Sequence, residues 1–394
     1  MSISGKRIQG GSSHAARGAA LAAIAAIGLA TAALDGAEAQ SGRSAPSFPA
    51  TLRSQTAPAV PAATPQEASA RRALEAQVRA LGQAFSGDIG IAVKDVQTGW
   101  TASYDGNTFF PQQSVSKFWV ALTAFDKADR GQLSLDSPVT VRRDDMTLFH
   151  QPIAAQLGGG YSTTINSLIY RAITQSDNTC NDFVLWKAGG PTAVRDYLRS
   201  RRIEGIRFGP GERLLQSQIA GMEWKQSYAY NGAFYKARAA VPAAQRRAAF
   251  ERYIANPMDG ATPNGIVDAL ARLKRGELLS PASTQKLLSI MGNTKTGARR
   301  LKGGLAPGWQ LSHKTGTGQV LGGEQAGYND IGILTGPDGH SYAVAVMIRR
   351  TSAPLAQRMA AMQGTVKAVI SFDQNADGGY GMARYGAASD QGSR

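Results

Sequence analysis

The sequence contains few of the residues that build metal and disulfide sites. Cys180 is the single cysteine among 394 residues, so no disulfide can form within the chain. His150, His313 and His340 lie far apart in the sequence, and there is no H-E-x-x-H motif. We therefore expect no zinc site. The G-x-S-x-G and G-x-x-x-x-G-K-[ST] motifs are also absent, which excludes a nucleophile elbow and a phosphate-binding P-loop.

Acidic residues are scarce as well. The chain has 28 Asp and Glu against 43 Lys and Arg, for a net charge of +15. The cations are dispersed and no segment resembles a nucleic-acid-binding module, so we expect a solvated basic surface and no nucleic-acid partner. The alternatives are that the charge steers anionic substrates or attracts the protein to anionic surfaces.

The first 39 residues have the pattern of a secretory signal peptide. Basic residues precede an apolar run over residues 19–34, and Ala37-Glu38-Ala39 forms a cleavage site of the A-x-A type. The run is too short and too rich in small residues to make a good membrane span. We expect export across the inner membrane, a periplasmic location and no stable membrane insertion after cleavage.

Composition divides the mature chain into three parts. Residues 40–66 are rich in Ser, Pro and Ala and are expected to form a flexible lead, and residues 374–394 a disordered tail. Residues 67–373 form the expected catalytic region.

Strand patterns lie at both ends of the catalytic region, and helical patterns dominate its middle, residues 111–291. This order predicts an α+β fold, in which an antiparallel sheet flanked by helices is built from both chain ends and an all-helical domain is inserted. The active site is then expected in the seam between them. The expected helices cover residues 65–85 and 355–372, and the expected strands cover residues 88–96, 100–104, 308–313, 330–335 and 342–348.

Two S-x-x-K tetrapeptides occur in the chain. Ser114 and Lys117 open a nearly continuous apolar segment, which predicts a buried helix with Ser114 in its first turn. There the free N–H groups and the helix dipole favour an alkoxide, and an uncharged Lys117 on the same face is a competent base. In the second copy, Ser280 or Ser283 is expected to cap a helix and Lys286 to lie on its surface.

Two further motifs add polar groups. Ser176-Asp177-Asn178 either caps a helix or supplies a hydroxyl for proton transfer and an amide for a substrate. Of two K-T-G tripeptides, Lys314–Gly316 follows an alternating strand pattern, and the glycines of residues 315–318 would let a substrate lie along the backbone. Lys295–Gly297 sits between a helix end and two glycines, which favours a turn.

In this order and separation, S-x-x-K, S-D-N and K-T-G resemble class A serine β-lactamases and penicillin-binding proteins. The resemblance covers residues 67–373, and residues 262–318 resemble the class A segment that leads into the K-T-G strand. It implies a β-lactamase-like fold and hydrolysis of β-lactam antibiotics through an acyl ester on Ser114, without a metal or an organic cofactor. We also expect a monomer. The alternatives are a penicillin-binding enzyme or a β-lactam sensor, both of which deacylate slowly.

The resemblance implies a role for each matched residue. Ser114 would be the nucleophile, and Lys117 part of its proton relay. Ser176, held by Lys314, would pass a proton to the departing lactam nitrogen. Asn178 would bind the acyl amide of the substrate and help to position Lys117.

The resemblance also assigns the binding of charge. The backbone N–H groups of the nucleophile and of Thr317 would form the oxyanion hole. Thr315 and Thr317 would receive the substrate carboxylate, with Gly316 between them. The family supplies a nearby cation from one of two positions; this chain has Asn329 at one, so we assign Arg300 at the other, with Arg299 as the alternative.

The deacylating base belongs to a family pattern, E-x-x-L-N. Here the pattern matches Glu212 to Gln216, so Gln216 replaces the family's asparagine and would hold the hydrolytic water differently. Glu212 is the expected base and Glu223 the alternative.

Two features near this pattern concern the cleft mouth. His150 falls where the family often has an aromatic residue, although without the family it would be interpreted as a surface loop residue. Residues 220–259 are an insertion relative to the family. It either overhangs the cleft or packs on the surface through its aromatic side chains.

Overall fold

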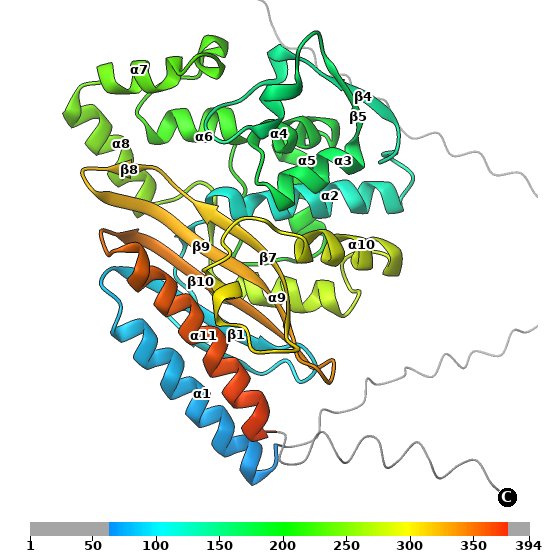
Figure 1. Ribbon diagram of the computed structural model, residues 1–394, viewed down its shortest axis with the longest axis vertical. Helices are drawn as coiled ribbons and strands as arrows, with labels where there is room; N and C mark the ends of the chain where they lie inside the picture. Colours follow the sequence, from blue (N-terminus) through cyan, green and yellow to red (C-terminus); the bar gives the residue numbers. More distant parts are fainter. Residues whose placement is uncertain (1–62, 377–394) are drawn as a thin grey trace, which may run out of the picture. The chain divides into compact units, whose positions relative to one another are not determined.

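The computed structural model describes residues 63–376, which lie in one compact unit of the chain (Figure 1). The predicted signal peptide and most of the predicted lead and tail lie outside the described residues. Helix α1 begins at Pro65 and α11 ends at Ala376, so these helices include the last residues of the expected lead and the first of the expected tail. No helix in the described range 63–376 is both long and apolar enough to cross a membrane.

An antiparallel sheet is built from both ends of the described chain, which confirms the predicted fold class. Strand β9 extends well beyond the residues that the pattern predicted, because Gln325 to Leu334 are buried without interruption and show no alternation. Among the described residues the sheet has six strands in the order β2-β1-β10-β9-β7, with β8 paired to β9. The strands are β1 (Asp88–Asp95), β2 (Thr101–Tyr104), β7 (Gln310–Thr317), β8 (Val320–Leu321), β9 (Glu324–Thr335) and β10 (Ser341–Thr351).

Two helices from opposite chain ends cover one face of the sheet (Figure 1). These are α1 (Pro65–Gln83), capped by the Thr64 side chain, and α11 (Leu355–Ala376). The predicted apolar face of α1, with Leu74 and Val78, packs into a buried cluster that includes side chains of α11 and β10. Burial of each such side chain contributes about 1.5–3 kcal/mol, so this layer fixes the sheet on which the site rests.

The other face of the sheet packs against the helical middle of the chain. Phe118, Trp119 and Leu122 of α2 lie in the same buried cluster as Leu270 of α9 and Met347 of β10. Two short strand pairs that the sequence did not predict, β3 with β6 and β4 with β5, tie this region together. The elements are α2 (Lys117–Asp129), α3 (Ile165–Thr174), α4 (Asn178–Lys187), α5 (Gly190–Ser200), α6 (Glu212–Ile219), α9 (Pro263–Lys274), α10 (Pro281–Gly292), β3 (Phe110–Pro111), β4 (Pro138–Val141), β5 (Tyr161–Thr164) and β6 (Gly260–Ala261).

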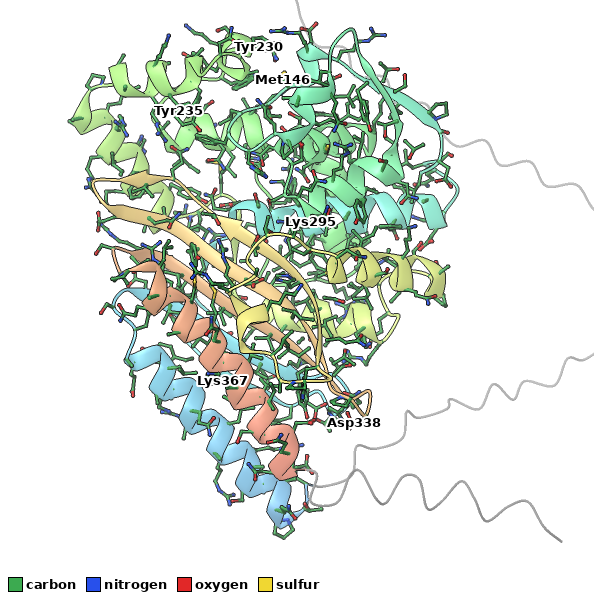
Figure 2. The ribbon with its side chains drawn as sticks, in the orientation of Figure 1. Met146, Tyr230, Tyr235, Lys295, Asp338 and Lys367 are labelled. Carbon is green, nitrogen blue, oxygen red and sulfur yellow. The ribbon has the colours of Figure 1, made fainter. Side chains whose placement is uncertain are left out.

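The insertion forms two helices, α7 (Ala233–Ala240) and α8 (Ala243–Ala255). Helix α8 packs on α6 through Phe250 and Ile254. Phe234 of α7 is buried against Leu148, with Trp224 and Tyr228 packed around it. Tyr235, labelled in Figure 2, is exposed on α7. The insertion is therefore fixed to the helix that carries Glu212.

The β1–β2 and β9–β10 hairpin turns lie at the same end of the sheet and are joined by a pair of side chains. His340 Nε2 lies 3.2 Å from Asp95 Oδ2. Burial disfavours the imidazolium, but the hydrogen bond and the charge of Asp95 outweigh burial and raise the pKa of His340. Burial likewise opposes ionisation of Asp95, yet the contact with His340 and the Gln97 and Thr98 N–H groups lower its pKa.

We expect the His340→Gln substitution to cost more stability at about pH 5.5 than at about pH 8.5. A raised His340 pKa stabilises the fold below its unfolded-state value, and this contribution is lost as the pH rises through the folded-state pKa. The lowered Asp95 pKa contributes above its unfolded-state value and is lost as the pH falls through the folded-state pKa. Urea unfolding at both pH values measures the difference, with the exposed His150→Gln as control. Equal losses at both pH values would contradict this assignment.

Candidate active site

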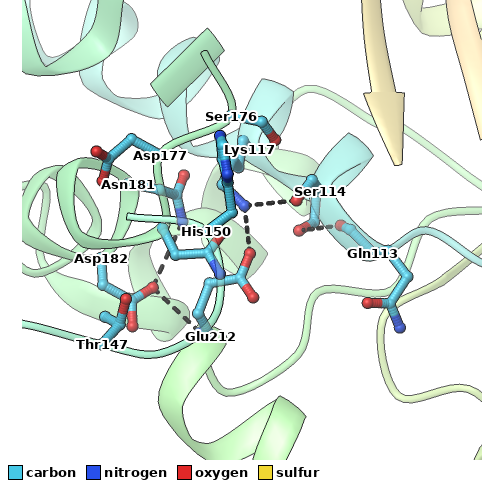
Figure 3. A network of polar contacts seen from close by, with 12 residues as sticks. Gln113, Ser114, Lys117, Thr147, His150, Ser176, Asp177, Asn181, Asp182 and Glu212 are labelled. Atoms are coloured by element: carbon cyan, nitrogen blue, oxygen red, sulfur yellow. Dashed lines mark hydrogen bonds and ion pairs between the residues drawn. The ribbon is translucent and has the colours of Figure 1, made fainter. Parts of the chain in front are cut away.

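Ser114 lies in a 3₁₀ turn, Gln113–Ser116, and not in the first turn of an α-helix as predicted. Helix α2 begins at Lys117, since a 3₁₀ turn, common at helix N-termini, precedes it and starts at Gln113 with a left-handed backbone (φ 53°). The two motif side chains still meet, since Lys117 Nζ donates a 2.8 Å hydrogen bond to Ser114 Oγ (Figure 3). Lys117 is 1% exposed, so the expected nucleophile contacts a buried amine.

Glu212, the first residue of α6, contacts the same amine. Its Oε1 atom forms a close ion pair with Lys117 Nζ, and its side chain is buried (Figure 3). Lys117 therefore bridges the nucleophile and the expected deacylating base. The uncharged state expected for Lys117 stays a prediction.

Helix α6 is capped by a residue of another helix. Its N-cap, Gly211, has no side chain, but Asp182 of α4 accepts hydrogen bonds from the N–H groups of Glu212 (3.1 Å) and Arg213 (3.4 Å). Burial and the charge of Glu212 raise the pKa of Asp182 to about 6. This cap fixes the position of Glu212. No local pattern predicts it, since Asp182 and Glu212 are distant in the chain.

The S-D-N motif caps a helix, as expected, and also places a hydroxyl in the cleft. Asp177 caps α4 by accepting a 2.9 Å bond from the Cys180 N–H. Ser176, just before it, has a left-handed backbone (φ 60°), and its Oγ accepts a 2.9 Å hydrogen bond from Lys314 Nζ. Burial, with the nearby charges of Lys117 and Arg300, lowers the pKa of Lys314 well below its usual value. Ser176 and Lys314 therefore form a hydrogen-bonded pair, and Ser176 lines the same cleft as Ser114.

Strand β7 approaches the nucleophile closely at Gly316. A Cβ atom there would lie 2.3 Å from the Gln112 carbonyl oxygen, so only glycine fits. Asn329 of β9 fixes the segment just before Ser114, because its Nδ2 donates to the carbonyls of Pro111 (2.7 Å) and Gln112 (3.0 Å). The K-T-G strand thus forms one wall of the site.

Arg300 crosses the end of that strand. Its guanidinium donates to the carbonyl oxygens of Gly316 (2.9 Å) and Asn329 (2.6 Å) and to Thr317 Oγ1 (2.5 Å). It also lies over the ring of Tyr328, 3.8 Å from the centroid. The alternative, Arg299, is exposed and does not line the cleft. The geometry therefore favours Arg300 as the cation near the predicted carboxylate site.

Gln216 lies one turn after Glu212 on α6, and its side chain contacts the Glu212 carboxylate. Its Nε2 lies 3.3 Å from Glu212 Oε2 and donates a 2.9 Å hydrogen bond to Gln113 Oε1. Glu223, the alternative base, is exposed and lines a separate hollow on the insertion. Of the two carboxylates, Glu212 alone lines the cleft with Ser114.

Two further predicted residues, Asn178 and His150, line the cleft. Asn178 is buried, and its Nδ2 donates 2.9 Å to the Leu148 carbonyl, while its N–H bonds the His150 carbonyl. No hydrogen bond joins Asn178 to Lys117 in the described part of the chain, so the positioning role implied by the resemblance stays a prediction. His150 is exposed and contacts the Gln175 carbonyl at 2.8 Å.

These residues surround a cleft of about 510 Å³, a usual size for a small-molecule site. The lining also includes four residues that the sequence did not indicate as part of the site: Phe149, Thr296, Gly297 and Gln319. The turn expected at Lys295–Gly297 is present (Gly297 φ 73°), and it places Thr296 Oγ1 2.7 Å from Thr315 Oγ1. The cleft is lined by Ser114, Phe149, His150, Ser176, Asn178, Glu212, Gln216, Thr296, Gly297, Arg300, Thr315, Thr317, Gly318 and Gln319.

The second S-x-x-K copy lies outside the cleft. Ser280 caps α10 by accepting a 3.2 Å bond from the Ser283 N–H, and Ser283 Oγ donates to Asp129. Lys286 is exposed. The predicted capping role of this copy is confirmed.

The chain is similar to known β-lactamases along most of its described length. A model of the β-lactamase enzyme family matches residues 73–370. β-Lactamase VEB-1 of Pseudomonas aeruginosa is 26% identical over 261 residues, 66% of this chain and 77% of the relative. Extended-spectrum β-lactamase PER-1 of the same organism is 27% identical over 244 residues, 61% and 68% of the two chains.

Solved structures agree with the sequence matches. An ancestral (GNCA) class A β-lactamase aligns with a TM-score of 0.61 at 29% identity, over 75% of this chain and 98% of the other. The TLA-3 extended-spectrum β-lactamase shares the fold, with a TM-score of 0.63 at 24% identity over 77% and 98%. The chain therefore belongs to the β-lactamase enzyme family, and the resemblance to its class A serine members is confirmed.

Proposed function

We propose that this protein hydrolyses β-lactams in two steps, acylation of Ser114 and hydrolysis of the resulting ester by water. One observation carries the proposal: the buried Lys117 amine contacts both Ser114 Oγ and the Glu212 carboxylate. A nucleophile, a proton acceptor and a second base in direct contact are the parts that acyl transfer and ester hydrolysis need. The family membership and the β-lactamase relatives support the substrate class.

In the acylation step, Ser114 Oγ would attack the lactam carbonyl while Lys117 accepts its proton. The backbone N–H groups of Ser114 and Thr317 would stabilise the oxyanion. The pair of Ser176 and Lys314 would return a proton to the lactam nitrogen as the C–N bond breaks. The lowered pKa of Lys314 supports this role, because a proton is released more readily from such an amine.

In the hydrolysis step, Glu212 would deprotonate a water molecule that attacks the ester. The Gln216 amide, which touches Glu212, would help to orient that water. Intact-mass spectrometry after mixing with a penicillin tests the scheme over time. An adduct that appears and decays is expected; a persistent adduct would favour a penicillin-binding enzyme or sensor, and the absence of both an adduct and hydrolysed penicillin would overturn the proposal. We also propose that the protein is exported to the periplasm and acts as a monomer.

We expect Arg300→Ala to raise the KM for penicillins, because the substitution removes the guanidinium that would bind the substrate carboxylate. A hydrogen bond to a charged group is worth about 1.5–3 kcal/mol, which corresponds to a KM increase of about 10- to 150-fold. Steady-state kinetics of Arg300→Ala, with Arg299→Ala as the matched control, measure the effect. An unchanged KM for Arg300→Ala and a raised KM for Arg299→Ala would reverse the assignment.

A further inference from the structure

Three glutamine side chains form a continuous hydrogen-bonded chain beside Glu212. Gln319 Nε2 donates to Gln216 Oε1 (3.0 Å) and to the Gln216 carbonyl oxygen (2.9 Å). Gln216 Nε2 in turn donates to Gln113 Oε1 (2.9 Å) and lies 3.3 Å from Glu212 Oε2. The exposed fractions of Gln113, Gln216 and Gln319 are 1%, 5% and 9%, so water competes little for these amides.

Both ends of this glutamine chain are held by residues of the insertion. At one end, Arg238 of α7 donates to Gln319 Oε1 at 3.0 Å. At the other end, the Gln113 amide donates to the hydroxyl of Tyr253 on α8, which donates to Asp259 Oδ2 at 3.2 Å. Asp259 also accepts the Gln113 N–H at 2.8 Å.

The two ends give the chain a direction. A guanidinium can only donate hydrogen bonds, and an ionised carboxylate can only accept them. Arg238 therefore requires the Gln319 oxygen to face it, which leaves the Gln319 amide N–H₂ to donate to Gln216. Ionised Asp259 requires the Tyr253 hydroxyl to donate, which leaves that oxygen to accept from Gln113. Both constraints place the Gln216 oxygen toward Gln319 and its N–H₂ toward Glu212.

Arg238 is itself held in place by aromatic rings. Its guanidinium carbon lies 5.4 Å from the ring centre of Tyr235 and 5.9 Å from those of Phe149 and Phe234. No carboxylate lies within ion-pair distance of Arg238 in the range 63–376. The guanidinium is thus oriented by the aromatic side chains of the insertion and of the cleft wall, and its polar contact is Gln319.

We propose that Arg238 and Asp259 are positioning residues that fix the orientation of the Gln216 amide against Glu212, so that the insertion takes part in hydrolysis of the acyl-enzyme. This inference rests on the proposed two-step function. A glutamine has one more rotatable bond than the family's asparagine, and a fixed partner for its oxygen compensates for that freedom. The insertion supplies the donor-only end of the chain that fixes it.

The first test compares Arg238→Met with Arg238→Lys in the full-length protein, using the decay of the penicillin adduct measured by intact-mass spectrometry. Loss of one hydrogen bond in the chain is expected to slow decay by about two- to tenfold in Arg238→Met while adduct formation stays near the parent rate. Arg238→Lys, which keeps a donor-only group, should restore most of the rate. Arg252→Met is the control for charge loss, because Arg252 is exposed on α8 and lies outside the cleft.

The second test asks whether Arg238 acts through Gln216. Arg238→Met is expected to have no further effect on adduct decay in the Gln216→Ala background, as a double-mutant cycle requires of coupled residues. Gln319→Glu, which can pair with Arg238 but cannot donate to Gln216, should slow decay like Arg238→Met and provides a second variant if that protein fails to fold. Equal slowing by Arg252→Met, parent-like decay in Arg238→Met and Gln319→Glu, or an undiminished effect without Gln216 would each overturn this inference alone. A parent protein whose adduct never decays would overturn the proposed function together with it.

Discussion

The Ser114→Ala variant is expected to form no covalent adduct with any penicillin. The Ser114 hydroxyl lies in the cleft with its oxygen 2.8 Å from the Lys117 amine, and the substitution removes the hydroxyl that this amine contacts. Removing a catalytic nucleophile costs on the order of 10⁶-fold in rate, which would leave turnover at the background of the assay. Fluorescent penicillin labelling and intact-mass spectrometry both read out the loss.

The chain contains its own matched control for this experiment. Ser283 has the same S-x-x-K spacing, but it lies on α10 outside the cleft, and its hydroxyl donates to Asp129 of α2. Ser283→Ala is expected to leave labelling and hydrolysis at parent levels. A labelled Ser114→Ala protein, or an unlabelled Ser283→Ala protein, would exchange the roles of the two copies.

The Glu212→Ala variant is expected to trap the ester on Ser114. Without a carboxylate to deprotonate water, decay of the adduct should slow by about 10²- to 10⁴-fold, the usual contribution of a positioned general base. Acylation should remain measurable, because the pair of Ser176 and Lys314 is intact, although the amine of Lys117 loses its ion-pair partner. The persistent adduct should be visible as a stable mass increase.

Two companion variants separate the roles of this carboxylate. Glu212→Gln keeps an oxygen for the Lys117 contact but cannot act as a base, so its adduct should form faster than in Glu212→Ala and persist equally. Glu223→Ala should behave like the parent, since Glu223 lines a different hollow. Rapid adduct decay in Glu212→Ala combined with accumulation in Glu223→Ala would show that Glu212 is not the base.

The sequence predicted the layout of the fold because most of its elements carry a local pattern. The helix at α1 and the strand at β1 have regular apolar spacing, and their bounds lie close to those predicted. Strand β9 was predicted only in part, because it is central in the sheet and buries polar residues such as Asn329 and Asp330. Burial of a polar side chain depends on partners from distant parts of the chain, and no local pattern reports them.

The same distinction holds within the candidate site. Ser114 with Lys117 and Ser176 with Asn178 are near neighbours in sequence, so spacing alone brought each pair to attention. The contact of Asp182 with α6 and the path from Arg238 to Gln216 each join residues of different helices or loops. Their discovery required the fold, because side chains such as Gln319 carry no distinguishing pattern in the sequence.

The left-handed backbone at Gln113, Phe149 and Ser176 sets the stability of the fold against the chemistry of the cleft. Such conformations cost of order 1–3 kcal/mol each in residues other than glycine, and all three residues lie at the cleft or next to its nucleophile. Glycine would relieve the strain at each position but would remove the hydroxyl of Ser176, the amide of Gln113 or the ring of Phe149. A glycine at any of these three positions is therefore expected to make the folded protein more stable and the cleft less competent for its chemistry.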